Sequence, residues 1–205
     1  MSRILSRALG LLIAITLPRL ASGESAKIGD SAPDFTLRSA QGAEVSLKNF
    51  TGKPVVLEWF NPGCPFVKKF YANGDMQRFQ RESIAKGAVW LTINSSAEGK
   101  QGHLTPAEAL DVISDLAVAS TAVLLDPTGS VGKLYGARTT PHVFVINPEG
   151  KLAYAGAIDN VASTRSSDIA SATNYVLSAL DSIKAGKSPS PSDTEPYGCG
   201  VKYAS

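Results

Sequence analysis

An apolar run of strand length, followed at once by a turn and a helix start, constrains the fold of this chain more than any other feature. The run is VVLEWF at positions 55–60, and only Glu58 interrupts it. The tripeptide NPG that follows is typical of a turn. Pro65 then suits the first position of a helix, where no backbone N–H is needed. A continuous apolar strand that feeds a helix predicts a central strand of a layered sheet.

Strands and helices alternate along the rest of the chain. One helical stretch is predicted from about Pro65 to Lys86, bent or split at Asn73-Gly74, and a final helix from about Ser167 to Gly186. The other predicted elements are a hairpin at 34–47, strands at 88–93, 122–126, 142–146 and 151–157, and a helix capped by Thr105 and Glu108. This order predicts an α/β fold with a central mixed β-sheet flanked by helices.

The two ends of the chain differ from its middle. Within residues 1–23, two arginines precede an apolar segment of ten residues at 8–17, and small residues follow at 21–23, which is the pattern of a cleaved secretory signal peptide. Spanning a bilayer takes about 20 apolar residues, so no stable membrane insertion is expected after cleavage. We predict a signal peptide at 1–23, a folded domain at 24–186 and a flexible, Pro/Ser-rich arm at 187–205. The mature protein would be periplasmic or secreted.

Charge and composition narrow the function. The formal net charge is only +2 and no basic patch stands out, so we expect no nucleic-acid partner. With 43% apolar residues the chain can build an ordinary core. We also expect no cofactor and no resident metal.

Cys64 is one of two cysteines in the chain, and its neighbours point to a reactive thiol. The residue before a proline avoids the α conformation, so Pro65 places Cys64 at the helix N-cap. Its side chain would then face the free N–H groups of Phe66 and Val67, and Lys68 adds positive potential. Such surroundings lower a thiol pKa from about 8.5. The alternative is a small buried hydrophobic residue.

Three segments, in this order, resemble known parts of one fold. VVLEWFNPGCPFVKK resembles the active-site strand and helix of the thioredoxin fold. IGDSAPDFTL resembles the opening of redoxins and peroxiredoxins, and TTPHVFVINPEGKLAYAGAID resembles the cis-proline strand and the hairpin after it. The resemblance covers about residues 28–185 and is to exported redoxin proteins of the alkyl hydroperoxide reductase/thiol-specific antioxidant superfamily. It implies a thioredoxin-like fold with an N-terminal β-hairpin.

The resemblance also implies roles for single residues. Cys64 matches the first cysteine of the family's Cys-x-x-Cys, while Val67 replaces the second. Glu58 matches a buried acid that shuttles protons, and burial should raise its pKa; a structural, ion-paired acid is the alternative. Pro141 matches the cis-proline, which lets the Thr140 backbone pair with a bound substrate. An ordinary trans proline is the alternative.

Cys199 lies in the arm, between two glycines that allow the backbone to adapt to disulfide geometry. The stretch 187–198 could extend to about 40 Å, so Cys199 can reach Cys64. We predict that Cys199 is the resolving thiol that replaces the one missing at Val67. It could instead form a permanent disulfide staple, or be an unpaired or intermolecular cysteine.

These observations predict a thiol–disulfide oxidoreductase that acts on a protein or small-molecule thiol, disulfide or peroxide and is reduced by a thiol protein. A peroxiredoxin-like peroxidase is a second possible function. Its usual threonine is replaced by Asn61, which can still donate a hydrogen bond to substrate, and Arg138 is the candidate for its arginine. A copper(I) site built from Cys64, His142 and Cys199 is a third. A non-catalytic binding domain is a fourth.

Overall fold

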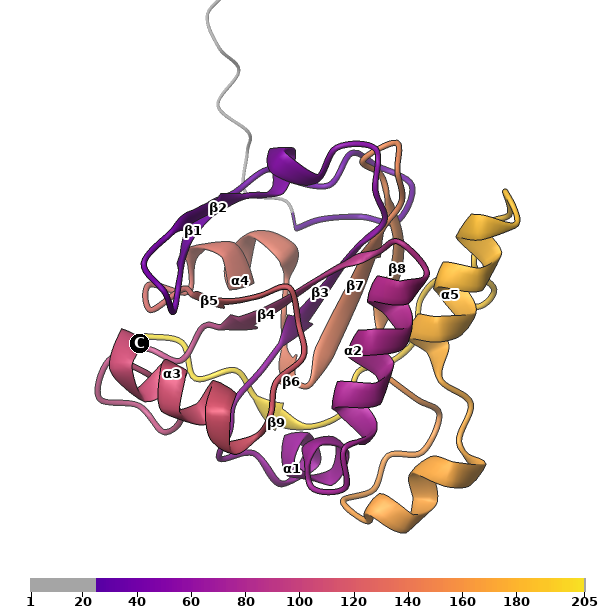
Figure 1. Ribbon diagram of the computed structural model, residues 1–205. Helices are drawn as coiled ribbons and strands as arrows, with labels where there is room; N and C mark the ends of the chain where they lie inside the picture. Colours follow the sequence, from indigo (N-terminus) through magenta and orange to yellow (C-terminus); the bar gives the residue numbers. More distant parts are fainter. Residues whose placement is uncertain (1–24, 205) are drawn as a thin grey trace, which may run out of the picture.

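Residues 25–204 are described by the computed structural model, so the predicted signal peptide lies outside the described residues. The elements, shown in Figure 1, are β1 (Thr36–Ser39), β2 (Glu44–Ser46), η1 (Leu47–Phe50), β3 (Val55–Trp59), α1 (Pro65–Tyr71), α2 (Asp75–Ala85), β4 (Val89–Asn94), α3 (Pro106–Asp115), β5 (Ala122–Leu125), α4 (Ser130–Tyr135), β6 (Thr139–Thr140), β7 (His142–Ile146), β8 (Leu152–Gly156), η2 (Ser166–Ser171), α5 (Tyr175–Lys184) and β9 (Cys199–Gly200).

Seven strands form one mixed sheet in the order β2-β1-β5-β4-β3-β7-β8. The three central strands β3, β4 and β5 are parallel, and β1 and β7 run antiparallel to them. Every residue of β3 is buried, as the apolar run predicted, and this includes Glu58. The N-terminal hairpin β1–β2 and the late hairpin β7–β8 are both present. The predicted α/β class with a mixed sheet flanked by helices is confirmed.

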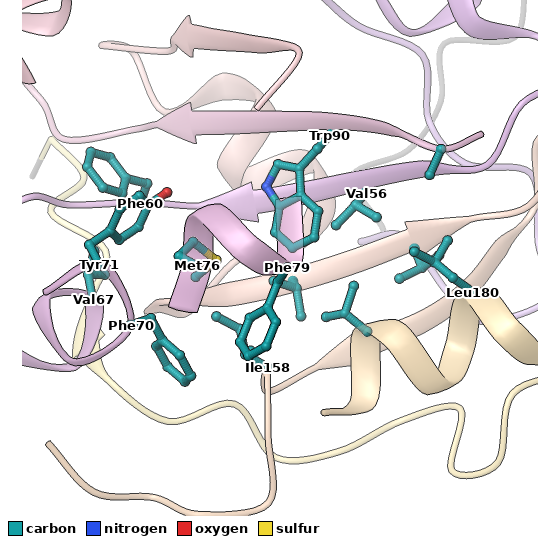
Figure 2. Close-up of a cluster of buried hydrophobic side chains, with 14 of the residues drawn as sticks. Val56, Phe60, Val67, Phe70, Tyr71, Met76, Phe79, Trp90, Ile158 and Leu180 are labelled. Carbon is teal, nitrogen blue, oxygen red and sulfur yellow. The ribbon is translucent and has the colours of Figure 1, made fainter. Parts of the chain in front are cut away.

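Alternation along β3 divides its side chains between two cores. Val56 faces α1, α2 and α5, in the cluster that Figure 2 shows with Phe79 and Trp90. Trp59 faces the other way, where its ring packs against Tyr135 of α4 at 5.7 Å. Because β3 is covered on both faces, the turn that follows it starts from a fixed base.

The helices that follow Pro65 match the prediction, whereas the final helix begins later than predicted. The stretch after Pro65 is split at Gly74, whose φ of 80° suits glycine. The final helix begins at Tyr175, later than predicted, because Asn174 rather than Ser167 caps it: the Asn174 side chain accepts a hydrogen bond from the Leu177 N–H at 2.9 Å. None of the helices between residues 25 and 204 is long and apolar enough to cross a membrane.

The C-terminal arm runs back along the domain, in yellow in Figure 1, instead of hanging free as the predicted flexible arm would. The Thr194 N–H donates to the Ala155 carbonyl at 3.1 Å, and the Tyr203 hydroxyl donates to the Ala137 carbonyl at 2.8 Å. A Cβ on Gly156 would lie 2.2 Å from the Thr194 hydroxyl oxygen. The surface of the domain is therefore shaped to the arm, which its Pro/Ser-rich composition did not reveal.

Candidate active site

The turn that carries Cys64 is fixed by Asn61. The Asn61 side chain is buried, accepts the Gly63 N–H at 2.9 Å and donates to the Gln101 side chain at 3.0 Å. A Cβ on Gly63 would lie 1.8 Å from the Gln101 amide nitrogen, so a larger residue there would displace the Gln101 side chain. The Asn61 amide thus forms hydrogen bonds within the protein and positions the turn. None of these contacts bears on the prediction that Asn61 binds substrate.

Cys64 is the N-cap of α1, as predicted, and its sulfur lies at the cis-proline edge. The amides of Val67 and Lys68 bond to the Cys64 carbonyl oxygen. The thiol donates to the Thr140 carbonyl at 3.0 Å and is only 1% exposed. The Thr140–Pro141 peptide bond is cis, as the resemblance implied.

The arm brings Cys199 to the same edge. The strand β9 pairs antiparallel with β6, and Cys199 stands directly opposite Thr140. The sulfur atoms of Cys64 and Cys199 are 2.7 Å apart, and both residues are free thiols in this structure. A small movement would join them, so the predicted partnership of the two cysteines is sterically available.

The pKa values of the two thiols are shifted in opposite directions. Burial acts to raise the pKa of Cys64, but hydrogen bonds from the Cys199 thiol and from the Val67 and Cys199 amides outweigh it, so the Cys64 pKa lies below its ordinary value. Burial, and next the thiol and the charge of Cys64, raise the pKa of Cys199 to about 11. Cys64 is therefore the more acidic thiol of the pair.

Gly198 allows the arm to approach the cis-proline edge. Its φ is 146°, and a Cβ there would lie 2.2 Å from the Thr140 carbonyl oxygen. Glycine is the residue that tolerates both this conformation and this distance. Gly200, on the other side of Cys199, has open space by comparison: its Cβ would meet nothing closer than the Arg138 carbonyl oxygen at 3.9 Å.

A buried ion pair anchors the arm two residues before Cys199. The Lys69 ammonium donates to Asp159 at 3.2 Å and to the Tyr197 hydroxyl at 3.2 Å, and Tyr197 donates in turn to Asp159. The Tyr197 ring packs edge-on against Phe66 at 5.8 Å. Sequence reasoning missed this cluster, because nothing local marks Lys69 as buried or links it to residues about 90 and 128 positions away.

Glu58 is fully buried and accepts hydrogen bonds from four side chains, Trp90 at 2.9 Å, Tyr71 at 3.0 Å, Thr92 at 3.1 Å and Gln80 at 3.3 Å. Burial nevertheless raises its pKa. Among residues 25–204 no hydrogen bond links this carboxyl group to either thiol. A structural acid, here bonded by neutral donors instead of a cation, fits these contacts better than a direct proton shuttle.

Arg138 and His142, the residues considered for a peroxidase and for a copper(I) site, are engaged with other groups. Arg138 makes an exposed ion pair with Glu195 of the arm at 3.1 Å. The Nδ1 of His142 accepts the Arg138 N–H at 3.2 Å, and burial and next the Arg138 charge lower the His142 pKa to about 3. In the described part of the chain, no three His, Cys, Asp or Glu side chains gather as a metal site would require. The predicted copper(I) site therefore gains no support from this geometry.

The profile of the AhpC/TSA family matches residues 28–155. The chain belongs to the AhpC/TSA family. It is 28% identical to the thiol-disulfide oxidoreductase ResA of Bacillus subtilis over 134 residues, which cover 64% of this chain and 68% of ResA. It is 27% identical to a thiol peroxidase of Corynebacterium glutamicum over 156 residues, which cover 73% of this chain and 89% of the peroxidase.

A solved structure shows the same fold. The thioredoxin domain of a thiol-disulfide oxidoreductase from Bacteroides vulgatus superposes with a TM-score of 0.51 at 19% identity, covering 72% of this chain and 98% of that domain. The thioredoxin-like fold that the sequence predicted for this AhpC/TSA protein is confirmed. The prediction of a thiol-dependent oxidoreductase is supported at the same level, because the relatives carry both kinds of thiol chemistry in their names.

Replacing Gly198 by alanine should keep the arm off the cis-proline edge and slow closure of the Cys64–Cys199 disulfide. Backbone strain of about 1–3 kcal/mol predicts a loss of about tenfold or more in rate. The rate would be measured by adding a thiol oxidant to the reduced protein, quenching samples at intervals and determining the mass of the products by mass spectrometry. Gly200→Ala is the matched control and should close near the wild-type rate. Equal rates in the two variants would contradict the close approach at Gly198.

Glu58→Gln should become more stable than wild type as the pH rises. The raised pKa means that the folded protein holds the Glu58 proton more tightly than the unfolded chain does. Wild type therefore has its full stability below the unfolded pKa of about 4.3 and loses some as the pH rises through the folded pKa. Glutamine can keep the network, with its oxygen in the place of Oε2 and its NH₂ donating to Tyr71.

Urea unfolding at pH 4 and pH 7 would test this. Glu82→Gln, which removes an acid that is exposed and paired with Arg78, is the control and should show no such growth. A stability difference that shrinks toward pH 7 would mean that the network favours the carboxylate. Slower disulfide closure in a fully stable Glu58→Gln protein would restore the proton-shuttle role.

Proposed function

We propose that this AhpC/TSA protein is an exported thiol–disulfide oxidoreductase in which Cys64 is the nucleophile and Cys199 the resolving thiol. The observation that carries the proposal is the 2.7 Å separation of the two sulfurs at the cis-proline edge. The more acidic thiol lies at the helix start, and the less acidic one arrives on the arm.

The reaction balances in two exchanges. The Cys64 thiolate attacks one sulfur of a substrate disulfide, forms a mixed disulfide and expels the other substrate thiolate. Cys199 loses its proton, attacks the Cys64 sulfur and expels the second substrate thiolate, which leaves a Cys64–Cys199 disulfide. A dithiol protein returns the pair to the reduced state by the same chemistry.

The first exchange prepares the second. The pKa of Cys199 is raised by burial and next by its hydrogen bond to Cys64 and the charge there. Once Cys64 is in a mixed disulfide it carries no charge and no longer holds the Cys199 proton. Those two contributions disappear, so Cys199 becomes more acidic at the step that requires its thiolate.

A thiol peroxidase is the second candidate, favoured by the family and by the Corynebacterium relative. Here the Cys64 thiolate would take one oxygen from a hydroperoxide and release an alcohol or water, and Cys199 would convert the sulfenic acid to the disulfide and water. Arg138, the candidate for the arginine of a peroxidase, is instead paired with Glu195 on the surface. Disulfide exchange is therefore the first proposal.

The remaining parts of the proposal, which are the localisation, the substrate-binding edge and the partners, are those that the sequence predicted. We assign residues 1–23 to a signal peptide and the protein to the periplasm or the exterior, where disulfides persist. Thr140 and Pro141 form the edge that receives substrate. The partners are a protein or small-molecule thiol or disulfide and a thiol reductant protein.

Cys199→Ser should trap the first exchange. With limiting glutathione disulfide, wild type should end as the intramolecular disulfide, while the variant should keep one glutathione on Cys64. Mass spectrometry of intact protein and of peptides distinguishes the two products. Cys64→Ser is the control and should react at least about tenfold more slowly, because the acidic thiol is gone. Adducts mainly on Cys199, or a stable adduct on wild type, would contradict the assignment.

The same samples separate the two candidate reactions. Glutathione disulfide should consume the wild-type thiols at least as fast as an equal concentration of hydrogen peroxide. If peroxide is faster by orders of magnitude, the peroxidase candidate replaces the exchanger.

A further inference from the structure

Tyr197 occupies a built pocket on the domain. We call the Tyr197 pocket the site formed by Phe66, Lys69, Asp159 and the Val161 carbonyl. The side chains of Lys69 and Asp159 are 0% and 2% exposed, and the Lys69 ammonium also donates to the Val161 carbonyl at 2.8 Å. Buried charges are costly unless they are paired and hydrogen-bonded. A simple tether for a tail would not need such a pair at its base.

One segment of the arm contacts both the Tyr197 pocket and Cys64. Tyr197 and Cys199 are two residues apart, so in an extended segment their side chains point to the same side. Both meet the first turn of α1, where Tyr197 contacts Phe66 and Cys199 contacts Cys64. Any strand that pairs with Thr140 in the register of β9 would therefore place in the pocket the residue two before its own cysteine.

We propose that the Tyr197 pocket is a recognition site for an aromatic residue, tyrosine above all, that lies two positions before the reactive cysteine of a partner protein. The arm is then a tethered copy of that partner segment, and a partner must displace it to reach Cys64. The inference rests on the proposed function, because it names the class of protein substrate that the exchanger takes.

The chemistry of the pocket selects tyrosine. The edge of the Phe66 ring meets an aromatic ring, and the buried ion pair offers one donor and one acceptor to a hydroxyl group. A phenylalanine would fill the same space but leave Lys69 and Asp159 without that partner. Leaving buried polar groups unsatisfied weakens binding by about tenfold. An alanine would lose the ring contact as well.

The sequence of the arm supplies the probes. Three peptides with the sequence of residues 195–203, EPYGCGVKY, would carry tyrosine, phenylalanine or alanine at the position of Tyr197. Each is offered as its symmetric disulfide, so that attack by the Cys64 thiolate on either sulfur joins one peptide to Cys64 and releases the other as a thiolate. Two full-length proteins are compared: Cys199→Ser, and Cys199→Ser with Tyr197→Ala, in which the pocket is vacated. The readout is the rate of adduct formation by mass spectrometry.

We expect the vacated protein to react with the tyrosine peptide about tenfold faster than with the phenylalanine peptide, and slowest with the alanine peptide. The order should weaken in Cys199→Ser, where the protein's own Tyr197 still fills the pocket. Asp159→Asn, added to the vacated protein and checked for folding by circular dichroism, should reduce the advantage of tyrosine over phenylalanine.

Equal rates for the three peptides on the vacated protein would overturn the recognition site. Glutathione disulfide separates this from a failure of the proposed function. If it modifies Cys64 while the peptides show no order, only the recognition site is wrong. If neither glutathione disulfide nor any peptide reacts with Cys64, the exchanger itself is wrong, and the recognition site falls with it.

Discussion

The pairing of the short strands β6 and β9 is the contact on which the proposed chemistry of this protein depends. It places Cys199 opposite Thr140, and through Thr140 beside the thiol of Cys64. Two residues of backbone pairing contribute little stability on their own, since isolated two-stranded ribbons are marginal in water. The pairing persists because contacts on both sides hold the arm: Thr194 and Tyr197 before it, Tyr203 after it.

Those contacts also decide which motions are available. The buried Lys69–Asp159 pair needs its hydrogen bonds to remain favourable inside the protein. The hydrogen bonds from Lys69 to Asp159 and to the Val161 carbonyl lie within the domain, so they would remain if the arm detached. Only the bonds to Tyr197 would be lost. The arm can therefore detach without leaving a buried charge unpaired, which a pair shared between the arm and the domain would not allow.

The sequence predicted what is local and missed what is distant. The strand before Cys64, the proline-defined N-cap and the capping box of Thr105 follow from neighbouring residues, and all three are present. The path of the arm depends on Gly156, Gly198 and a buried lysine meeting residues far along the chain, and no short pattern announces such contacts. Asn61 shows the same limit: its type allowed substrate binding, but Gln101, 40 positions later, takes its amide.

In the proposed mechanism, a resolving thiol on the arm has a consequence for the order of the reaction steps. In the place of a second helix cysteine this chain has Val67, which is 1% exposed and part of the core. In the proposed mechanism resolution comes from Cys199, which pairs with the Thr140 edge. A protein substrate that pairs with the same edge cannot be bound while β9 is docked. For such a substrate the mixed disulfide forms with the arm detached, and it is resolved only as the substrate strand leaves the edge and β9 returns. A small disulfide or peroxide makes no strand contact, so with it Cys199 can stay in place throughout. In the proposed mechanism, the occupant of one short strand edge thus determines whether the substrate strand must leave that edge before the second exchange can occur.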